Sequence, residues 1–198
     1  AEALLETGNI NGCISLAHQF MRSYPDSPLM PEVLFLTGRA HLADREWLKA
    51  FNAFSEITKS FPETRTAREA VLQEGICLYR LQLFSGAISR LEKYLADNPK
   101  GESCGEALYY LGLACEETGR LEAAAEAFRK LALDHPSYSG AVDAYYRLGK
   151  NLFNAGLLDE AENAFYNFIE NAPHNADSYD QALFFLERIS FRKGRYTS

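Results

Sequence analysis

The chain has 198 residues, of which 47% are hydrophobic and 24% charged, and its 27 acidic and 20 basic residues give a net charge of -7. This composition is typical of a soluble protein with a packed core. Nucleic-acid binding depends on clustered Lys and Arg that release counterions from phosphates, so this acidic chain without a basic stripe is not expected to bind nucleic acid. No apolar run approaches the roughly 18 residues that a membrane-spanning helix needs, so we expect no membrane span.

Five prolines recur at a constant step of 37 residues: Pro25, Pro62, Pro99, Pro136 and Pro173. Small residues keep the same step, namely Gly38, Gly75, Gly112 and Gly149, and Ala50, Ala87, Ala124 and Ala161. Self-similarity at a fixed period of this length is typical of a repeat protein, in which each repeat is one supersecondary unit.

Each repeat is predicted to be a pair of helices. Segments such as Gly105 to Glu117 and Leu121 to Asp134 have apolar residues at helical spacing and no interior proline. A glycine inside a helix costs about 1 kcal/mol relative to alanine, so the recurrent glycine indicates a close crossing of the two helices. The proline follows where the second helix must stop, and Gly8, Gly119 and Gly156 are predicted to form the turn within a pair.

The period predicts a single array over residues 1–198. It comprises a partial repeat over 1–25, full repeats over 26–62, 63–99, 100–136 and 137–173, and a closing helix in 174–198. The sequence Glu6-Thr7-Gly8 matches Glu117-Thr118-Gly119, which places the first seven residues at the end of a first helix whose beginning is missing. We therefore expect the chain to be a fragment of a longer protein.

The spacing of the recurrent residues resembles that of one known family. The pattern is carried by Leu111, Gly112, Gly119, Ala124, Phe128 and Pro136, and it returns 37 residues later. This order resembles the tetratricopeptide repeat, which implies an all-α fold: an α-α superhelix, or solenoid, of antiparallel helix pairs whose first helices line the concave face. The first two repeats depart from the pattern, since Thr37 and Glu74 stand in the position of Leu111.

Repeats of 37 residues are similar to those of two groups of bacterial cell-envelope proteins, the lipoprotein of the outer-membrane protein assembly machinery and the periplasmic coordinator associated with Tol-Pal. The resemblance implies a non-enzymatic scaffold that binds a protein or peptide segment in the bacterial periplasm or cell envelope, with a membrane-associated complex as one such setting. Two alternatives stay open: a docking or sensor module of a larger multidomain enzyme, and a cytoplasmic adaptor.

The resemblance also implies which side chains face the groove, counted from the recurrent glycine of each first helix. These candidate partner-binding residues are Phe35, Arg39, Leu72, Ile76, Tyr79, Tyr109, Leu113, Tyr146, Lys150 and Phe153. An aromatic side chain with a polar tip buries much area at low entropic cost, which favours the tyrosines as contacts. Packing between neighbouring first helices explains Tyr109 and Tyr146 equally well, and it is the favoured explanation for Leu72 and Leu113.

An acidic rim follows the same step, and its members are Glu32, Glu69, Glu106, Asp143 and Asp180. A basic peptide could dock on these carboxylates. The favoured alternative is helix capping, because Thr66-x-x-Glu69 and Ser103-x-x-Glu106 have the spacing of capping boxes and Asp177-x-x-Asp180 is a related cap.

The remaining reactive residue types do not form a catalytic or metal-binding pattern. Cys13, Cys77 and Cys115 occupy repeat positions that are filled elsewhere by small or apolar residues, and His41 shares a position with Leu78 and Leu152, so all four are predicted to lie in the core. No Cys or His pair has zinc-ligand spacing. We expect no metal, no cofactor and no catalytic residue. Cysteines without disulfides favour a reducing compartment, against the envelope resemblance.

Overall fold

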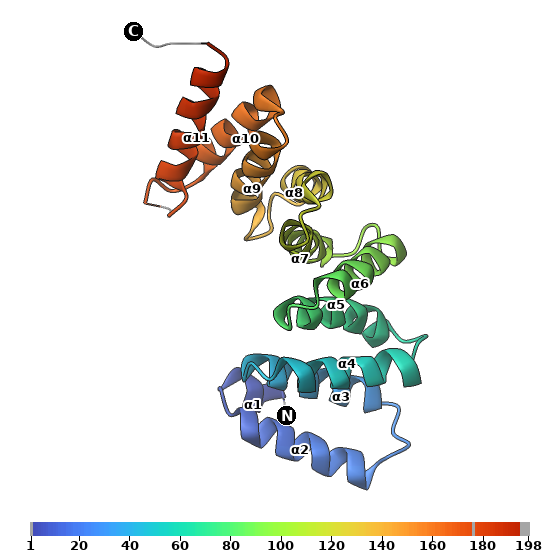
Figure 1. Ribbon diagram of the computed structural model, residues 1–198. Helices are drawn as coiled ribbons and strands as arrows, with labels where there is room; N and C mark the ends of the chain where they lie inside the picture. The colour runs from blue at the N-terminus through green and yellow to red at the C-terminus, as the bar shows by residue number, and fades with distance from the viewer. Residues whose placement is uncertain (1, 176, 195–198) are drawn as a thin grey trace. The chain divides into compact units, whose positions relative to one another are not determined.

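The structure is a computed structural model that describes residues 2–175 and 177–194, and every regular element in these ranges is an α-helix (Figure 1). The expected all-α class of paired helices is therefore confirmed. The chain divides into two compact units, Ala1–Asp97 and Asn98–Ser198. The single array over 1–198 and its repeat boundaries stay a prediction, although each range expected to be a full repeat contains one helix pair.

The first unit contains six helices among its described residues: α1 (Glu2–Glu6), α2 (Ile10–Ser23), α3 (Met30–Ala43), α4 (Trp47–Ser60), α5 (Arg65–Arg80) and α6 (Phe84–Asp97). We call α1, α3 and α5 first helices and α2, α4 and α6 second helices. Each second helix after α2 packs against the first helix of its own pair, and α4 also packs against α5. Phe54 and Ile57 of α4 and Ala67 and Ala70 of α5 are buried together in this core.

The second unit continues the alternation with α7 (Cys104–Glu117), α8 (Leu121–Asp134), α9 (Ala141–Asn154), α10 (Leu158–Asn171) and α11 (Tyr179–Arg192). Here α7, α9 and α11 are first helices, and α8 and α10 are second helices. The predicted segment Leu121 to Asp134 coincides with α8, and α7 starts one residue before the predicted Gly105. The helix expected in 174–198 is α11, while residues 176 and 195–198 of that range lie outside the described residues.

The recurrent glycine marks the crossing within each pair, and the structure shows what occupies the space beside it. A Cβ added to Gly38 would lie 2.6 Å from the ring of Phe54, and one added to Gly75 would lie 2.8 Å from Leu91. In the second unit Gly112 meets Phe128 and Gly149 meets Phe165 in the same way. The glycine is needed because the bulky residue of the second helix fills the position of its side chain.

The turns within the pairs share a left-handed residue. The predicted turn glycines have positive φ, with 77° at Gly8, 70° at Gly119 and 81° at Gly156. Arg45 and Gln82 hold the same repeat position with φ of 58° and 60°. The turn geometry is therefore kept in the two pairs that lack the glycine, at a cost in backbone strain.

The two irregular repeats accommodate their polar core residues by hydrogen bonding. The Thr37 hydroxyl donates to the Val33 carbonyl oxygen at 2.8 Å. Glu74 is fully buried, accepts a hydrogen bond from the Thr58 hydroxyl at 2.6 Å and forms an ion pair with Arg90 at 3.0 Å. A buried charge needs such partners, so the position of Leu111 can hold a carboxylate here.

Candidate functional site

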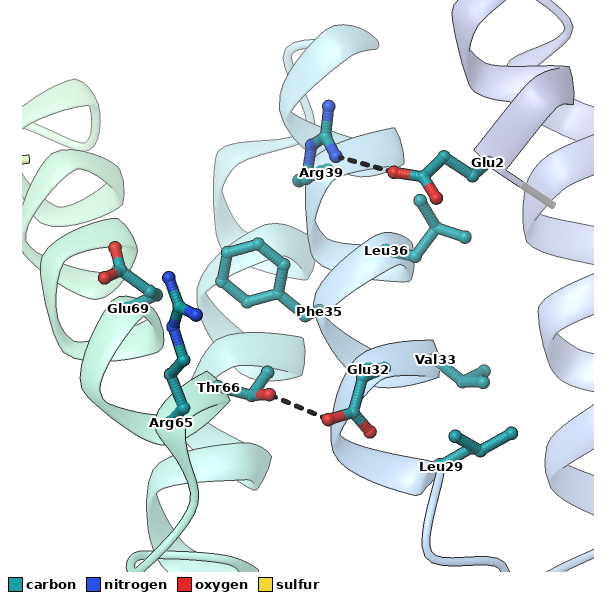
Figure 2. Close-up of a pocket in the computed structure, with 10 residues that line it drawn as sticks. All are labelled: Glu2, Leu29, Glu32, Val33, Phe35, Leu36, Arg39, Arg65, Thr66 and Glu69. Carbon is teal, nitrogen blue, oxygen red and sulfur yellow. Dashed lines mark hydrogen bonds and ion pairs between the residues drawn. The ribbon is translucent and has the colours of Figure 1, made fainter. Parts of the chain in front are cut away.

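A cavity of about 400 Å³ opens on the first-helix face of the first unit (Figure 2). Its lining is Glu2 of α1, Leu29, Glu32, Val33, Phe35, Leu36 and Arg39 in and beside α3, and Arg65, Thr66 and Glu69 of α5. Figure 2 shows Phe35 pointing toward α5 and Leu36, Val33 and Leu29 pointing the other way along α3. The structure thus brings four predicted site residues, Phe35, Arg39, Glu32 and Glu69, to one concave surface with an apolar floor.

The polar groups of this cavity have specific partners. The Thr66 hydroxyl donates to Glu32 at 3.0 Å and links α5 to α3, and Arg39 forms an ion pair with Glu2 at 3.7 Å (Figure 2). Below them the ring of Phe35 lies edge-on to that of Phe54, with centroids 5.2 Å apart. The floor is therefore fixed by core packing, while the rim is exposed and charged.

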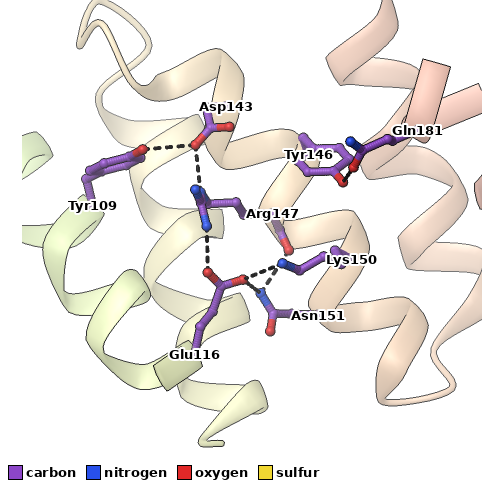
Figure 3. A network of polar contacts seen from close by, with 8 residues as sticks. All are labelled: Tyr109, Glu116, Asp143, Tyr146, Arg147, Lys150, Asn151 and Gln181. Atoms are coloured by element: carbon purple, nitrogen blue, oxygen red, sulfur yellow. Dashed lines mark hydrogen bonds and ion pairs between the residues drawn. The ribbon is translucent and has the colours of Figure 1, made fainter. Parts of the chain in front are cut away.

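The corresponding face of the second unit carries a hydrogen-bonded network instead (Figure 3). The Tyr109 hydroxyl on α7 donates to Asp143 on α9 at 3.0 Å, and the same Asp143 oxygen accepts from Arg147 at 2.7 Å. Arg147 also reaches back to Glu116 of α7 at 2.7 Å, where Asn151 donates to the other carboxylate oxygen at 2.8 Å. These contacts join α7 and α9 at two places, Tyr109 and Glu116.

The pKa values of Tyr109 and Arg147 are both raised in this network. Burial raises the pKa of Tyr109, and the Asp143 carboxylate raises it further. Burial opposes the charge of Arg147, but its hydrogen bond to Asp143 and the charges of Asp143 and Glu116 outweigh this effect and raise its pKa. Arg147 is therefore a permanent cation held between two carboxylates, and Tyr109 is a neutral donor.

A second hydrogen bond of this kind links α9 to α11. The Tyr146 hydroxyl donates to Gln181 at 2.5 Å, and its ring packs against Phe168 with centroids 5.5 Å apart (Figure 3). Burial raises the pKa of Tyr146 as well. Both tyrosines predicted to be either contacts or packing residues thus hold neighbouring first helices together.

The other predicted groove residues differ in accessibility. Leu72 and Ile76 are buried, as is Phe153, whose ring lies 5.1 Å from that of Phe185. Tyr79 and Leu113 are half-buried. Lys150 is half-buried too and lies 3.7 Å from Glu116. Tyr146 is buried as well. Buried side chains offer a partner little surface. Arg39 is the exposed member of the ten, and the half-buried members are Phe35, Tyr79, Tyr109, Leu113 and Lys150.

The capping explanation of the acidic rim is wrong at two places. Thr64, not Thr66, caps α5, because its hydroxyl oxygen accepts from the Ala67 N–H at 3.1 Å. The cap residue of α11 is Ser178, not Asp177. At α7 the cap residue is Ser103 as predicted, but its side chain makes no capping hydrogen bond.

The five rim carboxylates therefore do different things. Glu32 is exposed beside the cavity and Asp180 is exposed at the start of α11, whereas Glu69, Glu106 and Asp143 are half-buried. Asp143 belongs to the Arg147 network.

Sequence reasoning missed Arg147, Asn151 and Gln181. Arg147 follows Asp143 by four residues, a spacing that pairs opposite charges on one helix face, so this contact could have been found. Gln181 was missed because the repeat slips by one residue: α9 starts at Ala141 and α11 at Tyr179, so Gln181 takes the position of Asp143 and Asp180 does not.

The residues considered for metal or thiol chemistry lie in the core. Cys13, Cys77, Cys104 and Cys115 are free thiols and all are buried. His41 is buried and its Nδ1 lies 2.7 Å from a Glu46 oxygen, in agreement with the predicted core histidine. In residues 2–175 and 177–194 no three His, Cys, Asp or Glu side chains gather as metal ligands would. Within the same ranges, no helix is both long and apolar enough to cross a membrane.

The helices form pairs at a constant step, and a bulky residue packs on each crossing glycine. A cavity opens on the first-helix face. These features define a helical repeat protein of the kind that binds other proteins. Sequence patterns of the tetratricopeptide repeat match residues 72–141 and 143–175, just over half of the chain. The chain belongs to the tetratricopeptide repeat family. Proteins of this family are in general interaction modules and not enzymes, and the broad class of this chain is accordingly a protein-interaction scaffold.

Relatives and solved structures agree with this assignment. The outer membrane protein assembly factor BamD of Caulobacter vibrioides is 25% identical over 113 residues, which are 57% of this chain and 36% of that protein. The chain thus matches about a third of that relative's length. MamA from Desulfovibrio magneticus RS-1 has a TM-score of 0.69 at 21% identity, covering 94% of this chain and 90% of that one. A tetratricopeptide repeat protein from Parabacteroides merdae has a TM-score of 0.72 at 18% identity, covering 98% and 71%. At these identities the structural likeness concerns the fold alone.

Proposed function

We propose that this chain is a non-enzymatic scaffold that binds a segment of a partner protein along the face of its first helices, within a bacterial cell-envelope complex. The observation that carries the proposal is the cavity of about 400 Å³ on the first-helix face of the first unit. An apolar floor fixed by packing and a rim of separate charged groups are what a peptide-binding site needs. Arg39 and Phe35 are its proposed contacts, with Glu32 and Glu69 on the rim.

The similarity to the outer membrane protein assembly factor supports the envelope setting, including a membrane-associated complex in the periplasm. The free cysteines do not oppose it. The four thiols are buried, and burial together with Glu74 raises the pKa of Cys77 to about 12. Oxidation proceeds through exposed thiolates, so buried thiols persist in an oxidising compartment as well as in a reducing one.

A site-specific cross-linking experiment tests the proposal in cells. A photo-reactive amino acid at Arg39, on the first-helix face, should yield a cross-linked partner protein. The same substitution at Lys130, exposed on the second helix α8, is the control and should yield none. Equal products from both positions, or none from either, would contradict binding on the first-helix face.

The identity of the cross-linked protein tests the setting separately. An envelope protein supports the proposed complex. A cytosolic protein supports the adaptor alternative, and a cross-link to a catalytic domain supports the docking-module alternative.

A further inference from the structure

Neighbouring first helices are joined by different side chains in the two units, and three repeat positions account for the difference. Tyr109, Glu116 and Arg147 link α7 to α9 by side-chain hydrogen bonds. Two repeats earlier, the same positions hold Phe35, Leu42 and Gln73. Phe35 has no hydroxyl to donate to Glu69, and Leu42 and Gln73 cannot form the ion pair, so the polar contacts of the second unit have no counterpart between α3 and α5, which the Thr66–Glu32 hydrogen bond links instead.

Aromatic rings add to this contrast. The Tyr138 ring packs against Tyr109 with centroids 6.0 Å apart, and a Cβ on Gly140 would lie 2.8 Å from Tyr138. In the first unit the position of Tyr138 holds the capping Thr64, and that of Gly140 holds Thr66, whose hydroxyl bonds Glu32. Tyrosine rings thus pack beside α7 in the second unit, whereas threonines stand at the α5 edge of the cavity in the first.

The floor of the cavity fits an apolar side chain. Leu29 is 55% exposed, and Val33, Phe35 and Leu36 are half-buried along the same helix. Its volume of about 400 Å³ is within the range of sites that hold small ligands or several side chains, roughly 300–1,000 Å³.

The rim fits a cation beside that side chain. The cavity lining has two guanidinium groups, Arg39, which pairs with Glu2, and the exposed Arg65 at the start of α5. The three carboxylates of the lining outnumber these two cations. Glu32 is exposed, and the partner that the structure gives it is the neutral hydroxyl of Thr66, which orients the carboxylate without neutralising it. An ammonium or guanidinium group on a bound segment would supply the missing charge.

We infer that the cavity of the first unit is the anchor point for a partner segment in which a large apolar residue is followed or preceded, within about one helical turn, by Lys or Arg. The inference rests on the proposed function and narrows it to one unit and one partner chemistry. On the first-helix face of the second unit, Asp143 and Glu116 are already bonded to Arg147, so this face is not the anchor.

Selection of random 12-residue peptides by phage display, on the whole chain, tests the inference. Peptides enriched on the wild-type chain should share Leu, Ile, Phe or Met close to Lys or Arg. Glu32→Lys should replace this preference by one for Asp or Glu. Asp180→Lys is the matched control, since it makes the same charge change in the first turn of another first helix, and it should leave the preference unchanged.

A second variant tests the apolar floor without endangering the fold. Leu29 is the cap residue of α3, so Leu29→Asn removes the apolar side chain while supplying a preferred cap. Affinity for a synthetic enriched peptide should fall roughly tenfold in the single variant Leu29→Asn, as fluorescence anisotropy would measure.

Each outcome decides. If enriched peptides bind both variants as tightly as the wild-type chain, the inference is overturned and the proposed function stands. The same holds if the wild-type chain enriches acidic peptides. No enrichment on any form of the chain would overturn the inference and count against peptide binding altogether.

Discussion

Each crossing glycine is required because the side chain that it faces occupies the space where a Cβ would lie. Phe128 is fully buried, and its ring lies 2.6 Å from where a Cβ of Gly112 would be. Gly86, also helical, has Leu78 at 3.4 Å from its own Cβ position, which is an ordinary contact. Two glycines in helices therefore serve different needs.

This difference predicts opposite effects of alanine on stability. Gly112→Ala should lower the free energy of unfolding by about 1–3 kcal/mol, because the buried ring cannot move aside. Gly86→Ala should raise it by up to about 1 kcal/mol, because alanine restricts the unfolded chain and favours the helix. Thermal unfolding followed by circular dichroism measures both. Shifts of the same sign would contradict the assigned crossing.

The left-handed turns give a second residue-scale prediction. Gln82 adopts φ of 60° in the position where other pairs have glycine. Gln82→Gly should stabilise the chain by about 1 kcal/mol, because glycine adopts this conformation without steric cost. Gln19→Gly, in the middle of α2, should destabilise it by a similar amount. A neutral or destabilising effect at position 82 would show that the turn is not strained.

Tyr138 predicts how stability changes at alkaline pH. Burial, aided by the charge of Glu106, raises its pKa to about 12 from an ordinary value of about 10. The folded chain holds the Tyr138 proton more tightly than the unfolded chain does. The contribution of Tyr138 to the free energy of unfolding is therefore complete below about pH 10 and is lost as the pH rises from about 10 to about 12. Urea unfolding across this range should show a shallower decline for Tyr138→Phe than for the control Tyr166→Phe. Identical slopes would exclude Tyr138 as a source of the decline.

At the scale of the helix, Arg147 fastens α7 to α9 through Glu116 and Asp143. The Glu116 side chain is only 13% exposed, so removal of the guanidinium leaves two poorly solvated carboxylates. Arg129 offers a comparison, since it bridges α8 and α10 through Glu126 and Glu160, two exposed carboxylates.

We expect Arg147→Met to cost about 1–3 kcal/mol of stability and Arg129→Met to cost less than about 1 kcal/mol. Adding Glu116→Gln to Arg147→Met should cost less than the sum of the single changes, because the two residues share one interaction. Chemical unfolding of the wild-type chain, Arg147→Met, Glu116→Gln and the double variant provides the double-mutant cycle. Additive costs would mean that Arg147 and Glu116 do not couple.

Helix pairs could be predicted from sequence because the period fixes them, and α8 agrees to the residue. The helix starts were less predictable, since Thr64 and Thr66 are equally good caps and only the backbone decides between them. The slip before α11 displaced the last rim position by one residue. The contrast between the two gaps could not be predicted, because it depends on which side chains meet across neighbouring helices.

At the scale of the whole molecule, one repeat pattern produces two units with the same helix pairing and different first-helix faces. The pattern alone indicated the family and the interaction role. Accessibility, which the period does not encode, separates the exposed Arg39 from the buried Leu72 and Ile76.

Hydrogen–deuterium exchange of the whole chain, with and without an enriched peptide, tests most directly whether the first helices of the first unit are the binding surface. The account predicts slower exchange within residues 30–43 and 65–80, the segments of α3 and α5, and little change within 84–97 and 121–134, the segments of α6 and α8. Protection confined to the second helices, with α3 and α5 unchanged, would contradict it.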